Sequence, residues 1–454
     1  MEERDIMSDK AIITSVSPGF MELLPEEQLE FDRIKSVIEE TYRGFGFVPL
    51  DTPVIERSEA LFAKAGGETE KQIYFVNKGR EDLTSMALRF DLTVPLARYV
   101  ADHFNDLSFP FRRYHISRVY RGERPQKGRF REFYQCDIDV IGKDVLSVKY
   151  DAEIPSVIYR LFKKLDFGAF TIRVNNRKVL NGLLRSFGMA DRAADILRTV
   201  DKAEKFDSQN DFISALKEIG LGQDLIEKTL SFISIKGSVF EVVSALRNLG
   251  VNDALFDEGV GELETVTKIM TENGVDESYF MIDLSIARGL DYYTGTVYET
   301  RFNDYPELGS ICSGGRFDDL ASLYTEQKLP GVGISIGLTR LFSKLREIGV
   351  IDCARKTSAD AVVVPISENN STVAMKLAGK LREDGFAIDV LLEDMKVKQK
   401  FRYAGKKNAK FTVVIGDEEE AAQTAVLQYA VNESLVKENV PFSELAGRMR
   451  EIRA

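Results

Sequence analysis

Several residue types are scarce or missing in this chain of 454 residues. It has no tryptophan, three cysteines and two histidines. The scattered cysteines Cys136, Cys312 and Cys353 give neither a disulfide framework nor zinc-ligand spacing, so we expect a reducing, cytoplasmic setting. A metal site built from several histidines is nearly excluded, because only His103 and His115 are available.

Long apolar runs and a net positive charge are also missing. No run approaches the roughly 18 apolar residues of a membrane span, and the start "MEERDIMSDK" lacks the apolar core of a signal peptide, so we expect no membrane partner. The net charge of −11 argues against attraction of nucleic acid over the whole surface, although a local basic patch stays open. The length and the apolar fraction of 44% predict two to four folded domains.

Hydrophobic periodicity changes along the chain and divides it into four parts. Strand-like and helix-like stretches mix in the first part, which resumes after an insertion of short helices between glycines. A linker then leads to a last part where strands and helices alternate, which predicts a small, mostly parallel sheet. The predicted boundaries are 1–169 and 276–346 for the first domain, 170–275 for the helical insertion, 347–359 for the linker and 360–454 for the last domain.

A dense basic stretch, "RRYHISRVYRGERPQKGRFR", covers residues 112–131 and holds eight lysines and arginines with one acid. Arginine outnumbers lysine there, which suits forked recognition of phosphate oxygens. A solvated basic face is the alternative interpretation. We favour a polyphosphate or nucleic-acid role, because the charges lie on two predicted strands that also carry aromatic residues.

The second of these strands, "REFYQCDIDVIG", has an unusually polar face. Side chains alternate between the two faces of a strand, so one face carries Arg131, Phe133, Gln135, Asp137 and Asp139. That face offers an aromatic plate for stacking, an amide, and two carboxylates able to hold an amine. An exposed sheet face is the alternative.

Four further segments place polar groups beside tight backbone. Asp91 in "LRFDLTVP" ends a strand, and an ordinary helix N-cap is its alternative role. Arg340 in "GVGISIGLTRL" lies in the first turn of a helix, which favours an anion. The glycines of "SGGRFDDLA" would let a ligand approach the backbone, or they form a plain turn. In "ARGLDYYTGTVYE", the lone cation Arg288 stands among glycines and tyrosines.

Together these segments resemble the motifs of histidyl-tRNA synthetases, which are class II aminoacyl-tRNA synthetases. "YRGERPQKGRFREFYQCDIDVIG" resembles the second class motif, "GVGISIGLTRL" the third, and the segment around Pro53 the first, which supplies a dimer interface in the class. "ARGLDYYTGTVYE" and "SGGRFDDLA" resemble the two histidine-specific signatures. The resemblance implies an α+β catalytic domain with an antiparallel sheet, a helical insertion and a C-terminal α/β anticodon-binding domain.

The resemblance also implies an activity. It is the ATP-dependent ligation of L-histidine to tRNA(His) through a histidyl-adenylate, with release of AMP and pyrophosphate, by a homodimer that uses Mg²⁺ with ATP. No side chain is predicted as a metal ligand. The implied roles are α-phosphate binding by Arg121 and Arg288, ATP binding by Glu123, Arg129, Phe133 and Arg340, and histidine binding by Asp91, Thr93, Gln135, Asp139, Arg288, Tyr292 and Tyr293.

Four positions depart from the family's pattern. The usual "KGTRDxLP"-like opening is replaced by "SPGFMELLP". Phe317 stands where the second signature usually has tyrosine, and Thr339 where the third motif usually has glutamate. Asp91 is one methylene shorter than the glutamate of many bacterial relatives.

Residues 396–410, "KVKQKFRYAGKKNAK", hold seven lysines and arginines and no acid. Such a stripe attracts phosphate locally, although a solvated helix face is the alternative. We expect Phe401 and Tyr403 to pack under the helix. The predicted tRNA-binding residues are Lys398, Lys400, Arg402, Lys406 and Lys407.

Two other functions compete with the ligase. One is the regulatory subunit of an ATP phosphoribosyltransferase, which senses histidine without catalysis; the other is a non-catalytic nucleotide- or RNA-binding scaffold. Regulatory relatives tend to lack the anticodon-binding domain and to lose ATP-binding arginines. Here residues 360–454 follow the expected pattern and Arg121, Arg129, Arg288 and Arg340 are present, which favours the enzyme.

Overall fold

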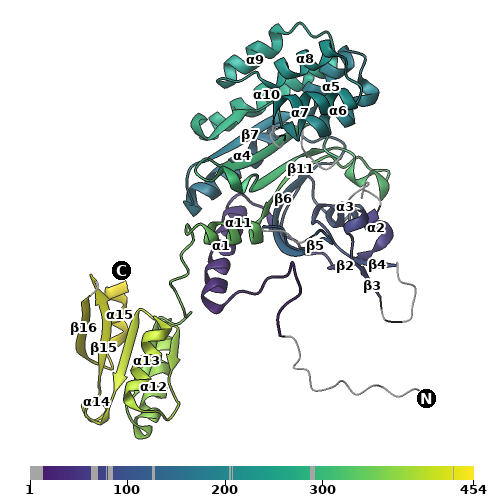
Figure 1. The fold of residues 1–454 in the computed structure, drawn as a ribbon. Helices are drawn as coiled ribbons and strands as arrows, with labels where there is room; N and C mark the ends of the chain where they lie inside the picture. Colours follow the sequence, from purple (N-terminus) through teal and green to yellow (C-terminus); the bar gives the residue numbers. More distant parts are fainter. Residues whose placement is uncertain are drawn as a thin grey trace. The chain divides into compact units, whose positions relative to one another are not determined.

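The structure is a computed structural model of the chain. It describes residues 14–62, 70–77, 79, 85–124, 128–203, 206, 208–286, 292–432 and 434–453. The chain divides into two compact units (Figure 1). The larger holds Met1–Met21 and Lys35–Ile351, and the smaller holds Glu22–Ile34 and Asp352–Ala454.

An eight-stranded sheet forms the centre of the larger unit. Its inner strands are antiparallel, and the strand at each edge pairs in parallel with its neighbour. This confirms the predicted class of fold. The strands follow the order β1 (Val48–Pro49), β5 (Phe111–Tyr120), β6 (Glu132–Ile141), β11 (Gly331–Gly337), β10 (Cys312–Phe317), β9 (Thr296–Phe302), β7 (Phe170–Asn176) and β8 (Phe280–Ile282).

One face of strand β6 packs on helices. Cys136, Ile138 and Val140 are fully buried, and the Tyr42 hydroxyl of α1 (Pro25–Gly44) donates to the Cys136 carbonyl over 3.1 Å. Helix α4 (Lys149–Leu165) contacts β7 and β11. Because side chains alternate along β6, this packing leaves the opposite face, which carries Gln135, free to line a cavity.

A small three-stranded sheet and two helices lie beside the large sheet. Strand β4 (Met86–Leu88) pairs on one side with β2 (Ile55–Arg57) and on the other with β3 (Phe75–Val76). Helix α2 (Ser58–Phe62) follows β2, and α3 (Thr93–Asp102) follows β4. The chain therefore enters α3 through Asp91, next to the end of β5, where the Arg89 carbonyl accepts from the Tyr120 amide.

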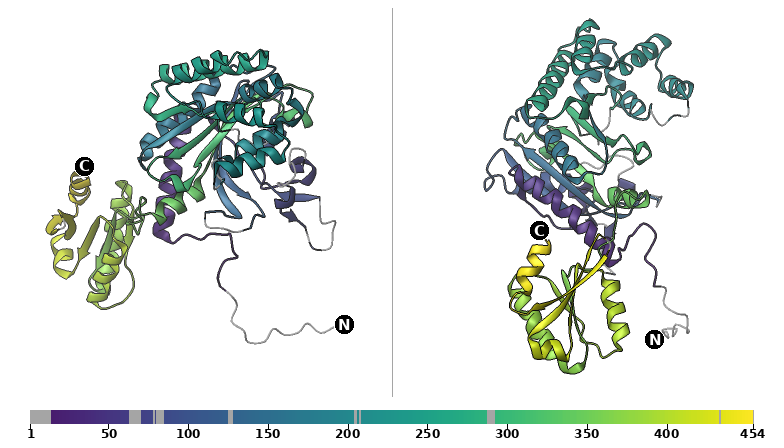
Figure 2. Two further views of the ribbon diagram at one scale, coloured as in Figure 1. Left: turned by 45° about the horizontal axis from the view of Figure 1, so that its top comes forward. Right: turned by 90° about the vertical axis from the view of Figure 1, so that its left-hand side faces the viewer.

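Six α-helices lie in the described part of the segment that follows β7. Figure 2 shows them in teal, gathered together. Helix α10 packs closely on α5 at Gly182. A Cβ on this glycine of α5 would lie 2.4 Å from the amide nitrogen of Phe256 in α10. Strand β7 was not predicted, since its short alternation precedes a strongly helical sequence. The helices are α5 (Arg177–Ser186), α6 (Ala193–Val200), α7 (Gln209–Glu218), α8 (Gln223–Ile233), α9 (Val239–Asn248) and α10 (Ala254–Glu272).

The smaller unit has a mixed sheet rather than the mostly parallel one we predicted. Strand β12 pairs in parallel with two neighbours, but β15 and β16 form an antiparallel hairpin that extends the sheet. The hairpin falls on the alternating stretch 424–441, which was not predicted as strands. The strand order is β13 (Ile388–Val390), β12 (Ala361–Pro365), β14 (Phe411–Ile415), β15 (Thr424–Val431) and β16 (Ser434–Pro441).

Among the described residues, four α-helices after residue 360 accompany this sheet. Leu377 and Met449 belong to one apolar core, whereas Ala404 packs with Val362 and Val364 in another. The two cores lie on opposite faces of β12, because its side chains alternate. The helices are α12 (Ser371–Glu383), α13 (Val397–Lys407), α14 (Asp417–Ala422) and α15 (Leu445–Arg453). Across the described part of the chain, we find no helix with the length and hydropathy needed to cross a membrane.

Candidate functional site

Two adjoining pockets lie against the polar face of β6. The first has a volume of about 470 Å³ and the second about 350 Å³. Four residues line both pockets: Arg121, Gln135, Ser313 and Ser335. Two ligands, or two parts of one ligand, can therefore meet at Arg121.

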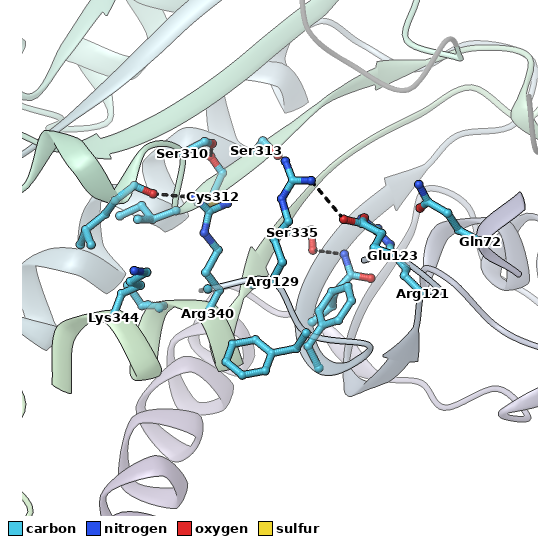
Figure 3. A pocket seen from close by; sticks show the side chains of 18 residues that line it. Gln72, Arg121, Glu123, Arg129, Ser310, Cys312, Ser313, Ser335, Arg340 and Lys344 are labelled. Atoms are coloured by element: carbon cyan, nitrogen blue, oxygen red, sulfur yellow. Dashed lines mark hydrogen bonds and ion pairs between the residues drawn. The ribbon is translucent and has the colours of Figure 1, made fainter. Parts of the chain in front are cut away.

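The first pocket is basic (Figure 3). Glu123 is the one acid among its described lining residues, against four cationic side chains. Arg340, in the first turn of α11 (Leu338–Glu347), donates from Nη2 to the Leu308 carbonyl over 2.7 Å. Such a lining favours a polyanion. The cationic residues are Arg121, Arg129, Arg340 and Lys344.

Arg121 is held in place at the junction of the pockets. Its Nε donates to the Phe90 carbonyl over 3.0 Å, and its guanidinium carbon lies 5.2 Å from the centroid of the Phe133 ring. Only part of the guanidinium is used by the backbone contact, so its remaining N–H groups can serve an anion. The Phe133 ring lines the first pocket, as predicted from the alternation of β6.

Glu123 and Arg129 form a weaker contact in the same pocket. Arg129 Nη1 lies 3.4 Å from Glu123 Oε2, and the Arg129 side chain is 61% exposed. Figure 3 shows this contact as a dashed line. An exposed pair of this kind contributes little to stability and can be rearranged by a ligand.

Thr339 explains one departure from the family's pattern. Its side-chain oxygen accepts a hydrogen bond of 2.8 Å from the Tyr134 amide, and the residue is buried. The contact ties the first turn of α11 to β6, directly between Phe133 and Gln135. Thr339 therefore supports the helix that carries Arg340, without lining either pocket itself.

The second pocket is acidic. Asp91, Asp137, Asp139 and Asp201 line it, and Arg121 is the one lysine or arginine among its described lining residues. Burial raises the pKa of Asp91 to about 6, that of Asp137 to about 7 and that of Asp139 to about 6. A cationic ligand would add positive charge to a lining in which the carboxyls outnumber the cations.

Asp91 contacts helix α3 and also lines the second pocket. Its Oδ1 accepts from the Val94 amide in the first turn of α3 over 3.1 Å, although the N-cap residue of this helix is Leu92 rather than Asp91. Its Oδ2 is buried without a hydrogen-bond partner in the described structure. Thr93, the first residue of α3, lines the same pocket.

Tyrosines close another side of the second pocket. The ring centroids of Tyr292 and Tyr293 are 4.9 Å apart, and Tyr292 lies edge-on to Phe317 at 6.0 Å. Phe317 is 2% exposed and packs in an apolar cluster with Leu96. At position 317, where the family usually has tyrosine, the phenylalanine ring therefore makes apolar contacts.

Asp139 depends on a neighbouring glycine. It forms an ion pair of 2.7 Å with Arg113 Nη2, and both side chains are buried. On the adjacent strand, a Cβ on Gly333 would lie 2.0 Å from Asp139 Oδ1. Glycine at this position therefore leaves the space that the Asp139 carboxylate occupies.

We predict a large effect of Gly333→Ala on ligand binding in the second pocket. Overpacking costs about 1–3 kcal/mol, so displacement of Asp139 should raise the Kd of the ligand that this pocket holds about 10- to 100-fold. Titration calorimetry would measure it. Gly261→Ala is the control, because nothing lies within 4 Å of a Cβ there. An unchanged Kd in Gly333→Ala would contradict the role given to this close approach.

Several residues that line the pockets were not predicted from the sequence. Ser335 shares the pocket face of β11 with Gly333, and the alternation of "GVGISIG" could have indicated it. Asp201 comes from the end of α6, in a segment without any motif, so no sequence signal pointed to it. Arg288, predicted as catalytic, lies outside the residues that the structure describes.

In the smaller unit, the predicted tRNA-binding residues do not form one surface. Lys398, Arg402 and Lys406 are exposed on α13. Lys400 is 3% exposed, and its ammonium donates to the Pro365 carbonyl over 2.9 Å. The prediction for Lys400 is therefore wrong: the helix turns this side chain toward β12, away from any phosphate at the surface.

The aromatic residues of α13 differ in exposure. The Tyr403 hydroxyl donates to Asp389 Oδ2 over 2.9 Å, and the ring packs against the core, as predicted. Lys407 lies 3.4 Å from the same carboxylate. Phe401 remains 36% exposed, so it is less packed than we expected.

Comparisons with known proteins agree with this geometry. Residues 19–341 match the family model "Histidyl-tRNA synthetase", and residues 360–452 match "Anticodon binding domain". The chain is 54% identical to a histidine–tRNA ligase from Clostridium tetani, over 91% of this chain and 93% of that protein. It is similar to the crystal structure of histidyl-tRNA synthetase from Nostoc sp. PCC 7120, with a TM-score of 0.88 and 38% identity over 97% of this chain and 100% of the other.

A further structure bears on the regulatory-subunit alternative. It is described as an ATP phosphoribosyltransferase regulatory subunit/histidyl-tRNA synthetase from Bacillus halodurans, with a TM-score of 0.73. Its identity is 22% over 90% of this chain and 99% of that one, so it shows the fold alone. It gives the regulatory alternative no better support than the ligase. From its family match, its relatives and its paired pockets, the chain belongs to the histidyl-tRNA synthetase family.

Proposed function

We propose that this chain ligates L-histidine to tRNA(His) with ATP, through a histidyl-adenylate, and releases AMP and pyrophosphate. The observation that carries the proposal is Arg121, which lines both the basic and the acidic pocket. ATP binds in the first pocket and histidine in the second, so the α-phosphate and the amino-acid carboxylate meet at this side chain.

The first pocket holds ATP by stacking and by charge. Phe133 stacks on adenine, and Glu123 accepts from the exocyclic amine of the base. Arg129 and Arg340 neutralise the β- and γ-phosphates. The two arginines line one pocket but come from distant parts of the chain, which supports a shared ligand.

A divalent ion accompanies ATP in aminoacyl-tRNA synthetases, and we propose Mg²⁺. Mg²⁺ prefers phosphate oxygens, water and one or two carboxylates. The oxygen donors of the first pocket include one carboxylate, Glu123, and three serine hydroxyls, which fits an ion carried mainly by the triphosphate. Bound there, the ion supplies charge neutralisation for the phosphates.

The second pocket holds histidine. Asp91, Gln135 and Asp139 bind the amine and the imidazole, and Thr93 assists. Unpartnered oxygens on Asp91 and Gln135 support this assignment, because a buried acceptor without a partner is costly unless a ligand supplies the donor. Tyr292 and Tyr293 line the pocket beside the ring.

The first chemical step joins two anions. The histidine carboxylate attacks the α-phosphorus of ATP in line, and pyrophosphate leaves. A hydroxyl of the terminal adenosine of the tRNA then attacks the carbonyl of the adenylate. Positioning and charge neutralisation dominate such a step, so Arg121, with Arg288 by resemblance, grips the α-phosphate. The reaction needs no histidine of the protein as a base.

Amino-acid-dependent exchange between ATP and pyrophosphate tests the proposed function. Among the natural amino acids, only L-histidine should support exchange. Arg288→Ala should abolish exchange while the fold is kept. A protein that binds histidine without exchange would instead be a regulatory subunit or a binding scaffold.

We propose that the smaller unit binds the anticodon end of the tRNA. The exposed cations Lys398, Arg402 and Lys406, with Lys407 beside them, would contact phosphates. A homodimer through the segment around Pro53 is supported by exposed apolar residues there, among them Val48 at 47% and Ile55 at 44%. We place the enzyme in the cytoplasm, where tRNA is charged.

Salt dependence separates surface contacts from buried ones. Lys398→Ala with Arg402→Ala should weaken tRNA binding and reduce the slope of log K against log salt by about 1–2, because two phosphate contacts are lost. Exchange without tRNA should stay unchanged. Lys400→Ala should lower stability but keep the salt slope. If the wild type, the double variant and Lys400→Ala all gave the same slope of log K against log salt, the proposed tRNA-binding surface would be contradicted.

A further inference from the structure

Two carboxylates in the second pocket, Asp137 and Asp201, have no assigned role, and Asp137 is the one that belongs to the central sheet. Asp137 lies on the pocket face of β6, two residues before Asp139, and is 2% exposed. Its Oδ1 is buried without a hydrogen-bond partner in the described structure. The other pocket acids are better compensated, because Asp139 has the ion pair with Arg113 and Asp91 accepts from the Val94 amide.

Arg113 is the main positive charge that acts on Asp137, and its guanidinium is paired with Asp139. His115 lies directly across from it on β5, but burial lowers the pKa of His115 to about 3, so this imidazole is neutral. Ser335 lies opposite on β11 and hydrogen-bonds to Asp137, while also accepting from Gln135 Nε2 over 2.9 Å. The remaining titratable groups around the pocket are Asp91, Arg113, Arg121, Asp139, Asp201, Tyr292, Tyr293 and Tyr298.

A buried carboxylate oxygen without a hydrogen-bond partner, in an acidic cavity, is best satisfied by a positively charged donor. The proposed substrate brings an imidazole with two ring nitrogens, and one acceptor alone would satisfy only one of them. We propose that Asp137 accepts a hydrogen bond from the second ring nitrogen, so that the pocket holds the side chain of the substrate as an imidazolium. The inference rests on the proposed function, because it concerns the same pocket and substrate.

Just below neutral pH, the proton for the ring comes from Asp137. Burial, opposed by Arg113 and reinforced by Asp139, raises the pKa of Asp137 to about 7 in the empty pocket. Between the ordinary pKa of an imidazole, about 6.5, and this value, a neutral ring and a protonated Asp137 give an imidazolium and a carboxylate, with no exchange with solvent. Below about 6.5 the free ring already carries its proton, and binding releases the proton of Asp137 to solvent. Above the pKa of Asp137, binding takes up one proton from solvent. Histidine binding therefore weakens by up to about tenfold per pH unit above about pH 7.

Kinetics with two substrates test the inference. We would measure the KM for histidine and for 1,2,4-triazolylalanine, whose ring is much less basic, in pyrophosphate exchange at about pH 7 and about pH 8.5. The proteins are wild type, Asp137→Asn, and the control Asp102→Asn, whose side chain is 69% exposed on α3. The KM for ATP in the same samples removes pH effects common to the whole enzyme.

In the wild type we expect the KM for histidine to rise about tenfold or more with pH, and histidine to be preferred over the triazole. Asp137→Asn should flatten the pH dependence and reduce the preference about tenfold, whereas the control keeps both. Asp137→Ser, with melting curves of all variants, guards against a folding defect. The inference would be overturned if Asp137→Asn kept the wild-type pH dependence of the KM for histidine and the wild-type preference for histidine over the triazole. It would also be overturned if the KM of the wild type for histidine did not change with pH. Failure of the wild type to exchange with histidine would instead overturn the proposed function.

Discussion

Arg121→Ala is expected to reduce histidine-dependent pyrophosphate exchange by about 10²- to 10³-fold or more, chiefly in kcat. Loss of one preorganised charge donor costs this much where charge develops in the transition state. Arg121 is the cation that both pockets share, and its orientation is fixed by the Phe90 carbonyl. Initial-rate exchange assays at saturating ATP would measure the effect.

Arg118→Ala is the matched control for this experiment. Arg118 lies three residues earlier on β5, its side chain is 52% exposed, and it is 3.6 Å from Glu132. It lines neither pocket, so exchange should be nearly unchanged. If Arg121→Ala and Arg118→Ala behaved alike, the junction of the two pockets would not be the place of reaction.

Asp151→Ala is expected to lower the free energy of unfolding by about 3–5 kcal/mol, because it leaves a buried charge without its partner. Arg316, in the second histidine signature, lies 2.7 Å from Asp151 Oδ1, and both side chains are nearly inaccessible. Thr296 donates to the same carboxylate over 2.7 Å. The pair fixes β10 and β9 to α4, next to the tyrosines of the second pocket.

Urea unfolding followed by far-ultraviolet circular dichroism would measure this loss. Asp224→Ala is the control, because it removes an exposed i,i+4 pair with Lys228 that contributes about 0.3–0.5 kcal/mol. Replacement of both members, Asp151→Leu with Arg316→Met, should recover part of the stability. A loss below about 1 kcal/mol in Asp151→Ala would contradict the role given to the pair.

The polar strand face was predictable from sequence because alternation has a fixed period. The sequence "REFYQCDIDVIG" placed Phe133, Gln135 and Asp139 together, and they line the two pockets. The direction in which a side chain points from a helix was predicted less reliably than the face of a strand. A stripe of lysines does not say which side of α13 faces the core, so Lys400 was wrongly grouped with the surface.

Contacts between distant segments had no sequence signal. Asp201 reaches the second pocket from the helical segment, and Thr339 contacts the Tyr134 amide across 205 residues of chain. The hairpin β15–β16 was overlooked because the regular alternation of strands and helices before it suggested a parallel sheet. The contacts of Asp201 and Thr339 depend on tertiary packing, which local patterns do not encode, whereas the hairpin carried a local alternation.

A crystal structure with a non-hydrolysable sulfamoyl analogue of histidyl-adenylate would test the central claim most directly. The account predicts adenine on the Phe133 ring in the first pocket, the imidazole beside Asp137 and Asp139 in the second, and the sulfamoyl group within hydrogen-bonding distance of Arg121. Adenine and imidazole in a single pocket, or an Arg121 guanidinium directed away from the sulfamoyl group, would contradict it.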